Sequence, residues 1–71
     1  MKKLIATQNI YENKRRIILK GKIYLIYSIF ESDTFDCGKG CVVFGEDDSF
    51  HGVDYDIFKT EKQIKAEEFN L

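Results

Sequence analysis

The sequence predicts a small, single-domain protein built mostly from β-strands. Its 71 residues leave room for one domain and one hydrophobic core. The longest apolar run, residues 17–30, is rich in Ile and Tyr, which favour a pleated strand, and Gly21 supplies a turn near its start. A strand–polar turn–strand pattern follows over residues 41–55. Both observations favour a β fold, because a helix over the apolar run would have no polar side to face water.

The chain begins with a predicted strand and a predicted loop. Residues 2–8 alternate in the direction of their side chains, which places Leu4 and Ala6 on one side of a strand. Residues 9–16 are polar and turn-prone, so we expect a long loop there. The apolar residues 17–19 are then expected to return to the core before the glycine turn.

Residues 22–30 are predicted to form one continuous second strand. The alternation of side chains defines its two faces. One face carries Ile23, Leu25, Tyr27 and Ile29, and the other carries Tyr24, Ile26, Ser28 and Phe30. Because both faces are apolar, we expect this strand to be covered on both sides for part of its length, as a central strand of a small barrel is.

The middle of the chain predicts a β-hairpin. Residues 31–39 are rich in Ser, Asp and Gly and indicate a turn region. Residues 41–44 form a predicted third strand, residues 46–49 a polar turn, and residues 50–55 a fourth strand. In the fourth strand Phe50, Gly52 and Asp54 alternate with His51, Val53 and Tyr55.

The C-terminal part predicts a charged tail. Residues 56–58 fit either a one-turn helix or the head of a short last strand. Good helix formers over residues 62–68 favour a helical tail, with Ile64 and Phe69 as its only apolar anchors. We therefore expect a domain over residues 1–60 and a tail over residues 61–71.

The order of these features resembles that of small SH3-like barrel proteins of bacteriophages and prophages, a family without assigned functions. The resemblance covers roughly residues 3–60 and leaves out the 37–41 segment and the tail. It rests on Leu19, Gly21-Lys22-Ile23-Tyr24, the hairpin Val42-Val43-Phe44-Gly45-Glu46-Asp47-Asp48, His51-Gly52-Val53 and Ile57-Phe58. It implies a five-stranded SH3-like barrel, and no particular activity, because this barrel hosts many unrelated functions.

The charges are unevenly distributed along the chain, although the net charge is only −1. Residues 1–22 hold seven Lys or Arg and one Glu, a balance of +6, and residues 31–56 hold one Lys against eight Asp or Glu, a balance of −7. Residues 57–71 cancel, with three Lys against three Glu. The two segments give a dipolar surface if they fold onto opposite sides, and salt bridges if strands interleave them.

The acidic hairpin and exposed tyrosines are the predicted binding site. The candidate residues are Glu46, Asp47, Asp48, Asp54, Tyr11 and Tyr55. Such a surface fits a basic partner, or an enzyme for which it imitates the phosphates of DNA; the alternative is a solvated turn. Phe50 and Phe58 are expected to pack in the core, whereas Tyr11 and Tyr55 are expected to be partly exposed.

A basic loop gives the alternative function. Lys14, Arg15 and Arg16 lie near Lys20, Lys22 and Tyr11, and basic loops with an aromatic neighbour hold phosphates and stack bases. The acidic half of the chain would repel a nucleic-acid backbone, so a nucleic-acid-binding barrel is the second interpretation.

The two cysteines leave three interpretations open. Cys37 and Cys41 flank Gly-Lys-Gly, a loop short enough for a disulfide, and with His51 and Asp36 or Asp54 they also offer metal ligands. Free thiols are the default where no secretion signal is apparent. The Gly-Lys-Gly segment lacks the remainder of a phosphate-binding loop.

The sequence therefore predicts a non-enzymatic, phage-type accessory protein that binds another protein. No cofactor and no metal are expected. The apolar runs near the start and over residues 23–30 are too short for a signal peptide or a membrane span, so we expect the cytoplasm of a bacterial host. The oligomeric state is left open.

Overall fold

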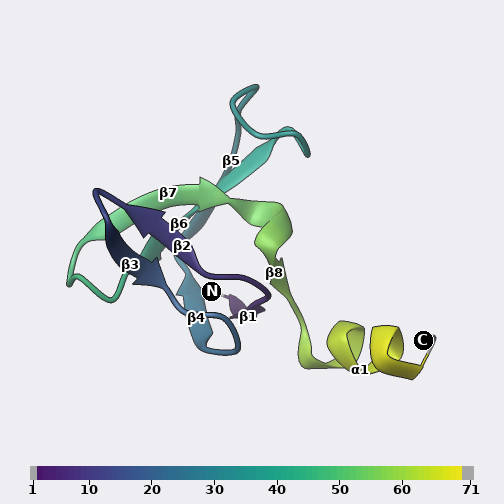
Figure 1. Cartoon of the computed structure of the whole chain (residues 1–71). Coiled ribbons are helices and arrows are strands. Elements are labelled where there is room, and N and C mark those ends of the chain that lie inside the picture. The colour runs from purple at the N-terminus through teal and green to yellow at the C-terminus, as the bar shows by residue number, and fades with distance from the viewer. Residues whose placement is uncertain (1, 70–71) are drawn as a thin grey trace.

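Eight short strands and one terminal helix make up residues 2–69, the part of the chain that the computed structural model describes; its side chains are described for residues 2–68 (Figure 1). In chain order the elements are β1 (Lys2–Ala6), β2 (Ile10–Glu12), β3 (Arg15–Ile18), β4 (Ile23–Ile26), β5 (Ser28–Glu31), β6 (Lys39–Phe44), β7 (Phe50–Asp54), the 3₁₀ turn η1 (Tyr55–Ile57), β8 (Phe58–Lys59) and α1 (Glu61–Phe69). The predicted mostly β fold is confirmed.

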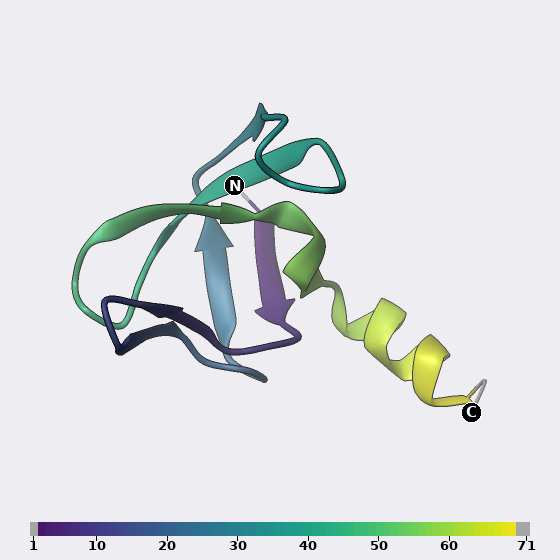
Figure 2. The ribbon, with the colours of Figure 1, turned by 45° about the horizontal axis from the view of Figure 1, so that its top comes forward.

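The strands pair into three antiparallel sheets. The first has the order β4-β1-β8, the second is the hairpin β2-β3, and the third has the order β5-β6-β7. Figure 2 shows β1 and β4 side by side, with β6 and β7 curving past them. The sheets are not closed into a barrel, so the five-stranded SH3-like barrel is not confirmed.

The predicted continuous strand over residues 22–30 is interrupted at Tyr27. Before it, β4 pairs with β1, with Tyr24 opposite Leu4. After it, β5 pairs with β6 of the third sheet, and the backbone N–H of Tyr27 donates to the Val42 carbonyl at 2.9 Å. The segment therefore bends from one sheet into the other, which joins two of the three sheets without a loop.

Only one face of this segment is buried, and only within β4, whereas all four residues of β5 are exposed, so the prediction of cover on both sides is wrong. Tyr24 and Ile26 of β4 are buried. Ile23, Tyr27 and Ile29 from the opposite set are 60%, 42% and 46% exposed. A chain of this size has too few apolar side chains to cover both faces of this segment.

The predicted loop over residues 9–16 is a β-hairpin. Asn13 and Lys14 form its turn, with φ of 51° and 66°. Two successive residues with positive φ are typical of the tight turn that matches the twist of paired strands. Asn adopts this conformation readily and Lys does so rarely, so the sequence signal for this turn is weak. Residues 17–19 do return to the core as expected, since Ile17 and Ile18 are fully buried.

The remaining predicted elements lie near their expected places. The first strand is β1, and its Leu4 and Ala6 are both buried. The hairpin of β6 and β7 matches the third and fourth predicted strands. The turn at Gly21 is present, with φ of 87°.

The core lies between the sheets and draws on almost every strand. It includes a T-shaped pair of the Tyr24 and Phe58 rings, whose centroids are 6.0 Å apart. The buried hydrophobic residues are Leu4, Ala6, Ile17, Ile18, Tyr24, Ile26, Cys41, Val43, Val53, Ile57 and Phe58. The predicted core position of Phe58 is confirmed.

Both predicted alternatives for residues 56–58 occur, because η1 leads directly into β8. The helix α1 then begins after Thr60, whose hydroxyl accepts from the Gln63 N–H at 3.1 Å, while the Gln63 side chain accepts from the Thr60 N–H at 2.8 Å. This reciprocal pair is a capping box, and it confirms the predicted helical tail.

The helix α1 points away from the strands, as both views show (Figures 1 and 2). Ile64 is half-buried, whereas the other predicted anchor, the Phe69 side chain, and residues 70–71 of the predicted tail lie outside the described residues. No helix in residues 2–69 is long and apolar enough to cross a membrane.

Candidate functional site

The acidic turn between β6 and β7, residues 45–49, is held tightly by its own backbone. Gly45 N–H donates to the Ser49 carbonyl at 2.8 Å, and Asp48, with a φ of 61°, donates from its N–H to the Gly45 carbonyl at 3.1 Å. The Glu46 N–H donates to the Ile17 carbonyl at the end of β3, at 2.8 Å. The turn is therefore fixed both within itself and to the neighbouring hairpin.

The Glu46 carboxylate is used inside the molecule. It forms an ion pair with Lys22 and accepts a hydrogen bond from the Tyr24 hydroxyl at 2.9 Å. The same hydroxyl accepts from the Leu19 N–H at 2.8 Å. The contacts with Lys22 and Tyr24 lower the pKa of Glu46, while burial, together with the Glu46 charge, raises the pKa of Tyr24.

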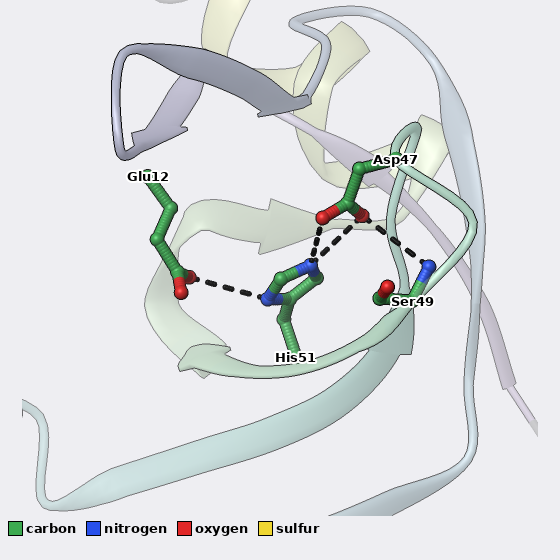
Figure 3. A network of polar contacts seen from close by, with 4 residues as sticks. All are labelled: Glu12, Asp47, Ser49 and His51. Atoms are coloured by element: carbon green, nitrogen blue, oxygen red, sulfur yellow. Dashed lines mark hydrogen bonds and ion pairs between the residues drawn. The ribbon is translucent and has the colours of Figure 1, made fainter.

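Asp47 is likewise engaged, through the single histidine (Figure 3). Both Asp47 carboxylate oxygens lie 2.9 Å from His51 Nε2, and His51 Nδ1 lies 3.2 Å from a Glu12 oxygen. The hydrogen bond from His51 lowers the pKa of Asp47. The imidazole thus joins β7 to the acidic turn on one side and to β2 on the other.

This arrangement of two carboxylates around His51 does not suit nucleophilic catalysis. A nucleophile needs one ring nitrogen of the histidine for its own proton. Here both nitrogens face carboxylates, and Ser49 contacts the cluster through its backbone N–H, 3.3 Å from Asp47 Oδ1 (Figure 3). The cluster acts as a structural link between three segments.

Asp54 is separated from the acidic turn by the length of β7, about 15 Å for a strand of this size. Its side chain accepts from the Asp56 N–H at 2.9 Å and so caps η1. It also accepts from the Cys37 thiol at 3.2 Å. Asp54 and the acidic turn therefore lie at opposite ends of β7, and the Asp54 carboxylate is used by contacts within the fold.

The two cysteines have free thiols in the structure, Cys37 exposed and Cys41 buried. Burial is the main cause that raises the pKa of Cys41 to about 11, with the Asp54 charge and Cys37 adding to it. Within residues 2–69, no group of three or more His, Cys, Asp or Glu side chains has a geometry that could hold a metal ion.

The basic residues lie on the β2–β3 hairpin. Lys14 occupies its turn, and Arg15 and Arg16 begin β3, all three exposed. The Arg16 guanidinium lies 5.8 Å from the centroid of the Tyr11 ring, which is 59% exposed. Tyr55 is half-buried against the core in η1, so both tyrosines are partly exposed as predicted, although they lie in different parts of the fold.

Three aromatic rings outside the predicted binding site gather on the surface. Tyr27, Phe44 and Phe50 are 42%, 41% and 58% exposed. The Phe50 ring makes T-shaped contacts with both others, at centroid distances of 5.0 Å each. We call these three residues the aromatic patch. The prediction that Phe50 lies in the core is wrong. Its exposure could have been predicted from the alternation of side chains, which places Phe50 on the same strand face as Gly52 and Asp54 rather than on the face of Val53.

A groove adjoins the aromatic patch. It has a volume of about 310 Å³ and runs from Phe44 past the outer side chains of β4 to the acidic turn. Its lining residues are Lys22, Ile23, Tyr24, Leu25, Phe44, Gly45, Glu46 and Asp48. Of the two carboxylates of the acidic turn that line this groove, only Asp48 has no ion pair among the described residues.

Comparisons of the chain with models of protein families, with curated proteins and with solved structures found no match.

Proposed function

We propose that this protein is a non-enzymatic binding module, and that the aromatic patch is its contact surface for another protein. The observation that carries the proposal is the exposure of three clustered rings, with Phe50 packed against the other two, on a 71-residue chain. Clustered exposed apolar side chains on a small protein mark interaction sites, whereas single exposed ones are ordinary.

The geometry of the aromatic patch suits binding. Edge-to-face contacts hold the rings in place before a partner arrives, so little side-chain entropy remains to be lost on association. Phe44 and Phe50 face each other across the β6–β7 ladder, on a rigid hairpin rather than a loop. Aromatic anchors of this kind supply much of the binding free energy in protein interfaces.

The acidic turn serves this surface mainly by supporting it. Glu46 and Asp47 are held by Lys22 and His51, which leaves Asp48 at the rim of the adjoining groove. A partner that inserts an apolar side chain into this groove would find one carboxylate beside it, which favours a basic flank on that partner.

The resemblance to small SH3-like barrels belongs to this proposal. Its support is the segment from β4 to β5, which passes between two sheets as a barrel strand does at a corner. A phage-type accessory protein in the bacterial cytoplasm is the setting that this resemblance implies.

A matched pair of variants tests the contact surface. Phe44→Ser with Phe50→Ser removes two rings of the aromatic patch, and Tyr11→Ser removes a ring elsewhere that is as exposed as Phe50. We expect proteins captured from bacterial lysate at moderate salt, identified by mass spectrometry, to be lost with the double variant and retained with Tyr11→Ser. Equal capture by the wild type and the double variant, both folded by circular dichroism, would contradict the proposal.

A second candidate function uses the basic hairpin. The stacking of Arg16 on exposed Tyr11, beside Lys14 and Arg15, favours contact with single-stranded nucleic acid. Glu12 lies opposite Arg15 in the same hairpin and weakens this surface for phosphates. Fluorescence anisotropy with labelled oligonucleotides at low salt tests this second function. Binding by the wild type that is lost in the double variant Arg15→Gln, Arg16→Gln supports it. No binding by the wild type contradicts it.

A further inference from the structure

The strand β5 is an open edge of the third sheet. Within residues 2–69, the order β5-β6-β7 leaves one side of β5 without a partner strand, and all four residues of β5 are exposed. In Figure 1, β5 and the loop after it project beyond the body of the molecule. Exposed strand edges offer a row of backbone donors and acceptors to another chain.

The hydrogen-bond alternation shows which backbone groups are open. The Ser32 N–H donates to the Gly38 carbonyl at 3.0 Å, in the same register that pairs Phe30 with Gly40. Hydrogen-bonded pairs recur at every second residue of an antiparallel ladder, so Ser28 and Phe30 bond to β6. The N–H and C=O groups of Ile29 and Glu31 therefore point away from the sheet.

The side chains of β5 present apolar surface on both faces of this edge. The Phe30 ring lies over two glycines: a Cβ atom on Gly40 would come within 2.5 Å of its Cζ, and one on Gly52 within 3.3 Å. Ile29 is on the opposite face, paired with Cys41, and is 46% exposed. A strand added beside β5 would thus cover Phe30 with one set of its side chains and Ile29 with the other.

The charges at one end of the β5 edge determine which kind of incoming strand this edge favours. Glu31 and the following acidic loop, residues 32–38 with Asp33 and Asp36, carry three exposed carboxylates, none in an ion pair among the described residues. Residues 31–38 hold no cation, and Lys39, the first residue of β6, lies opposite Glu31 in the ladder. Complementary charge favours an incoming segment with Lys or Arg at the end that lies beside Glu31.

We propose that β5 is a docking edge for an extended segment of a partner protein that combines alternating apolar residues with a basic end. This inference rests on the proposed binding function and names its partner chemistry. Backbone pairing with Ile29 and Glu31 supplies affinity, and the carboxylates of the acidic loop supply selectivity. A second copy fits this edge less well, because antiparallel pairing of two β5 strands would bring residues 26–28, which hold no cation, against the acidic loop.

The test uses two synthetic ten-residue peptides that alternate Val and Thr, one with Lys at both ends and one with Glu. Binding to the wild type is measured by calorimetry, and backbone exchange by NMR. We expect the Lys peptide to bind roughly tenfold more tightly than the Glu peptide. We also expect it to slow amide exchange at Ile29 and Glu31 specifically, since the amides of Ser28 and Phe30 are already bonded. Equal binding of the two peptides, or binding of neither, overturns the proposal.

Two variants separate docking from a loss of structure. Ile29→Pro removes an outward N–H without touching the ladder to β6, because Pro is tolerated where the N–H faces solvent. It should stay folded and lose the Lys peptide. The triple variant Glu31→Lys, Asp33→Lys, Asp36→Lys should reverse the preference toward the Glu peptide, which a misfolded chain would not do. An unchanged preference overturns the proposal, as does a wild-type dimer in sedimentation that Ile29→Pro abolishes, because a second copy would then occupy the edge.

The same variants distinguish this inference from the proposed function. If lysate capture survives in Ile29→Pro and is lost in the double variant of the aromatic patch, the docking edge is wrong and the binding surface stands. If capture survives in both, the proposed function fails as well.

Discussion

Two acidic segments of this chain look alike in sequence and differ in what they do. The acidic turn, residues 45–49, contains three carboxylates, and so does the stretch from Glu31 through the acidic loop, residues 31–38. In the turn, Glu46 is bound by Lys22 and Tyr24 from a distant segment, and Asp47 is bound by His51 of the strand that follows the turn. In the stretch from Glu31 no carboxylate of the described chain has such a partner. The number of acidic residues in a segment therefore does not show which carboxylates are available to a partner. That depends on which side chains of the same chain already contact them.

The largest expected effect is a loss of stability when a contact of the acidic turn is removed. Tyr24→Phe removes the hydroxyl between the Leu19 N–H and Glu46, leaving a part-buried donor without its partner. We expect the free energy of unfolding to fall by about 1–3 kcal/mol. For a domain of this size that lowers Tm by about 4–8 °C per kcal/mol, measurable by circular dichroism.

The control for Tyr24→Phe is Tyr11→Phe, which removes a hydroxyl from an exposed ring. Its Tm should stay close to that of the wild type. Similar losses in both variants would show that the hydroxyl network adds nothing specific to the acidic turn.

A smaller effect is expected in the pH dependence of stability. The folded-state pKa values of Glu46 and Asp47 are lowered, by Lys22 and by His51 respectively. Their stabilising contribution is therefore complete above the ordinary carboxyl pKa, near pH 4, and is lost as the pH falls through the lower folded values. Urea unfolding between pH 3 and pH 7 should show a steeper acid loss for the wild type than for Glu46→Gln with Asp47→Asn. Parallel curves for the two proteins would contradict the conclusion that the carboxylates of the acidic turn, unlike those of the acidic loop, stabilise the fold.

The smallest effect is expected in the acidic loop and its flank. Glu31→Gln, Asp33→Asn and Asp36→Asn together should change the free energy of unfolding by no more than about 0.5 kcal/mol, because these are exposed side chains without an ion pair among the described residues. The same variant should lose the preference for a basic peptide. A stability loss as large as that of Tyr24→Phe would mean that the acidic loop, too, is used internally.

The sequence predicted the parts of the fold that depend on neighbouring residues. The buried side of β1 and the β6–β7 hairpin follow from alternation and a polar turn, and both are present. The β2–β3 hairpin was missed because its turn places Lys14 at a positive φ, which local preference disfavours and tertiary pairing imposes. The bend at Tyr27 was missed because residues on both sides of it favour strands equally, and only the partner strands tell them apart.

The candidate site was less predictable than the fold. Acidic residues and turns are visible in the sequence, but the partners of Glu46 and Asp47 come from β4, the segment before it, and β7. The aromatic patch depends on Tyr27, at the bend between two sheets, reaching Phe50 of β7. Such encounters are fixed by three-dimensional packing rather than by spacing along the chain.

The different environments of the two cysteines have a practical consequence. Burial and a pKa of about 11 keep the Cys41 thiol protonated and out of reach near neutral pH, whereas Cys37 is exposed on the acidic loop. An alkylating dye should therefore attach to the wild-type protein at one position, a few residues from β5. Cys37 is therefore a site for labelling the protein without any substitution. A fluorophore attached to Cys37 would report directly the binding of a strand to the β5 edge.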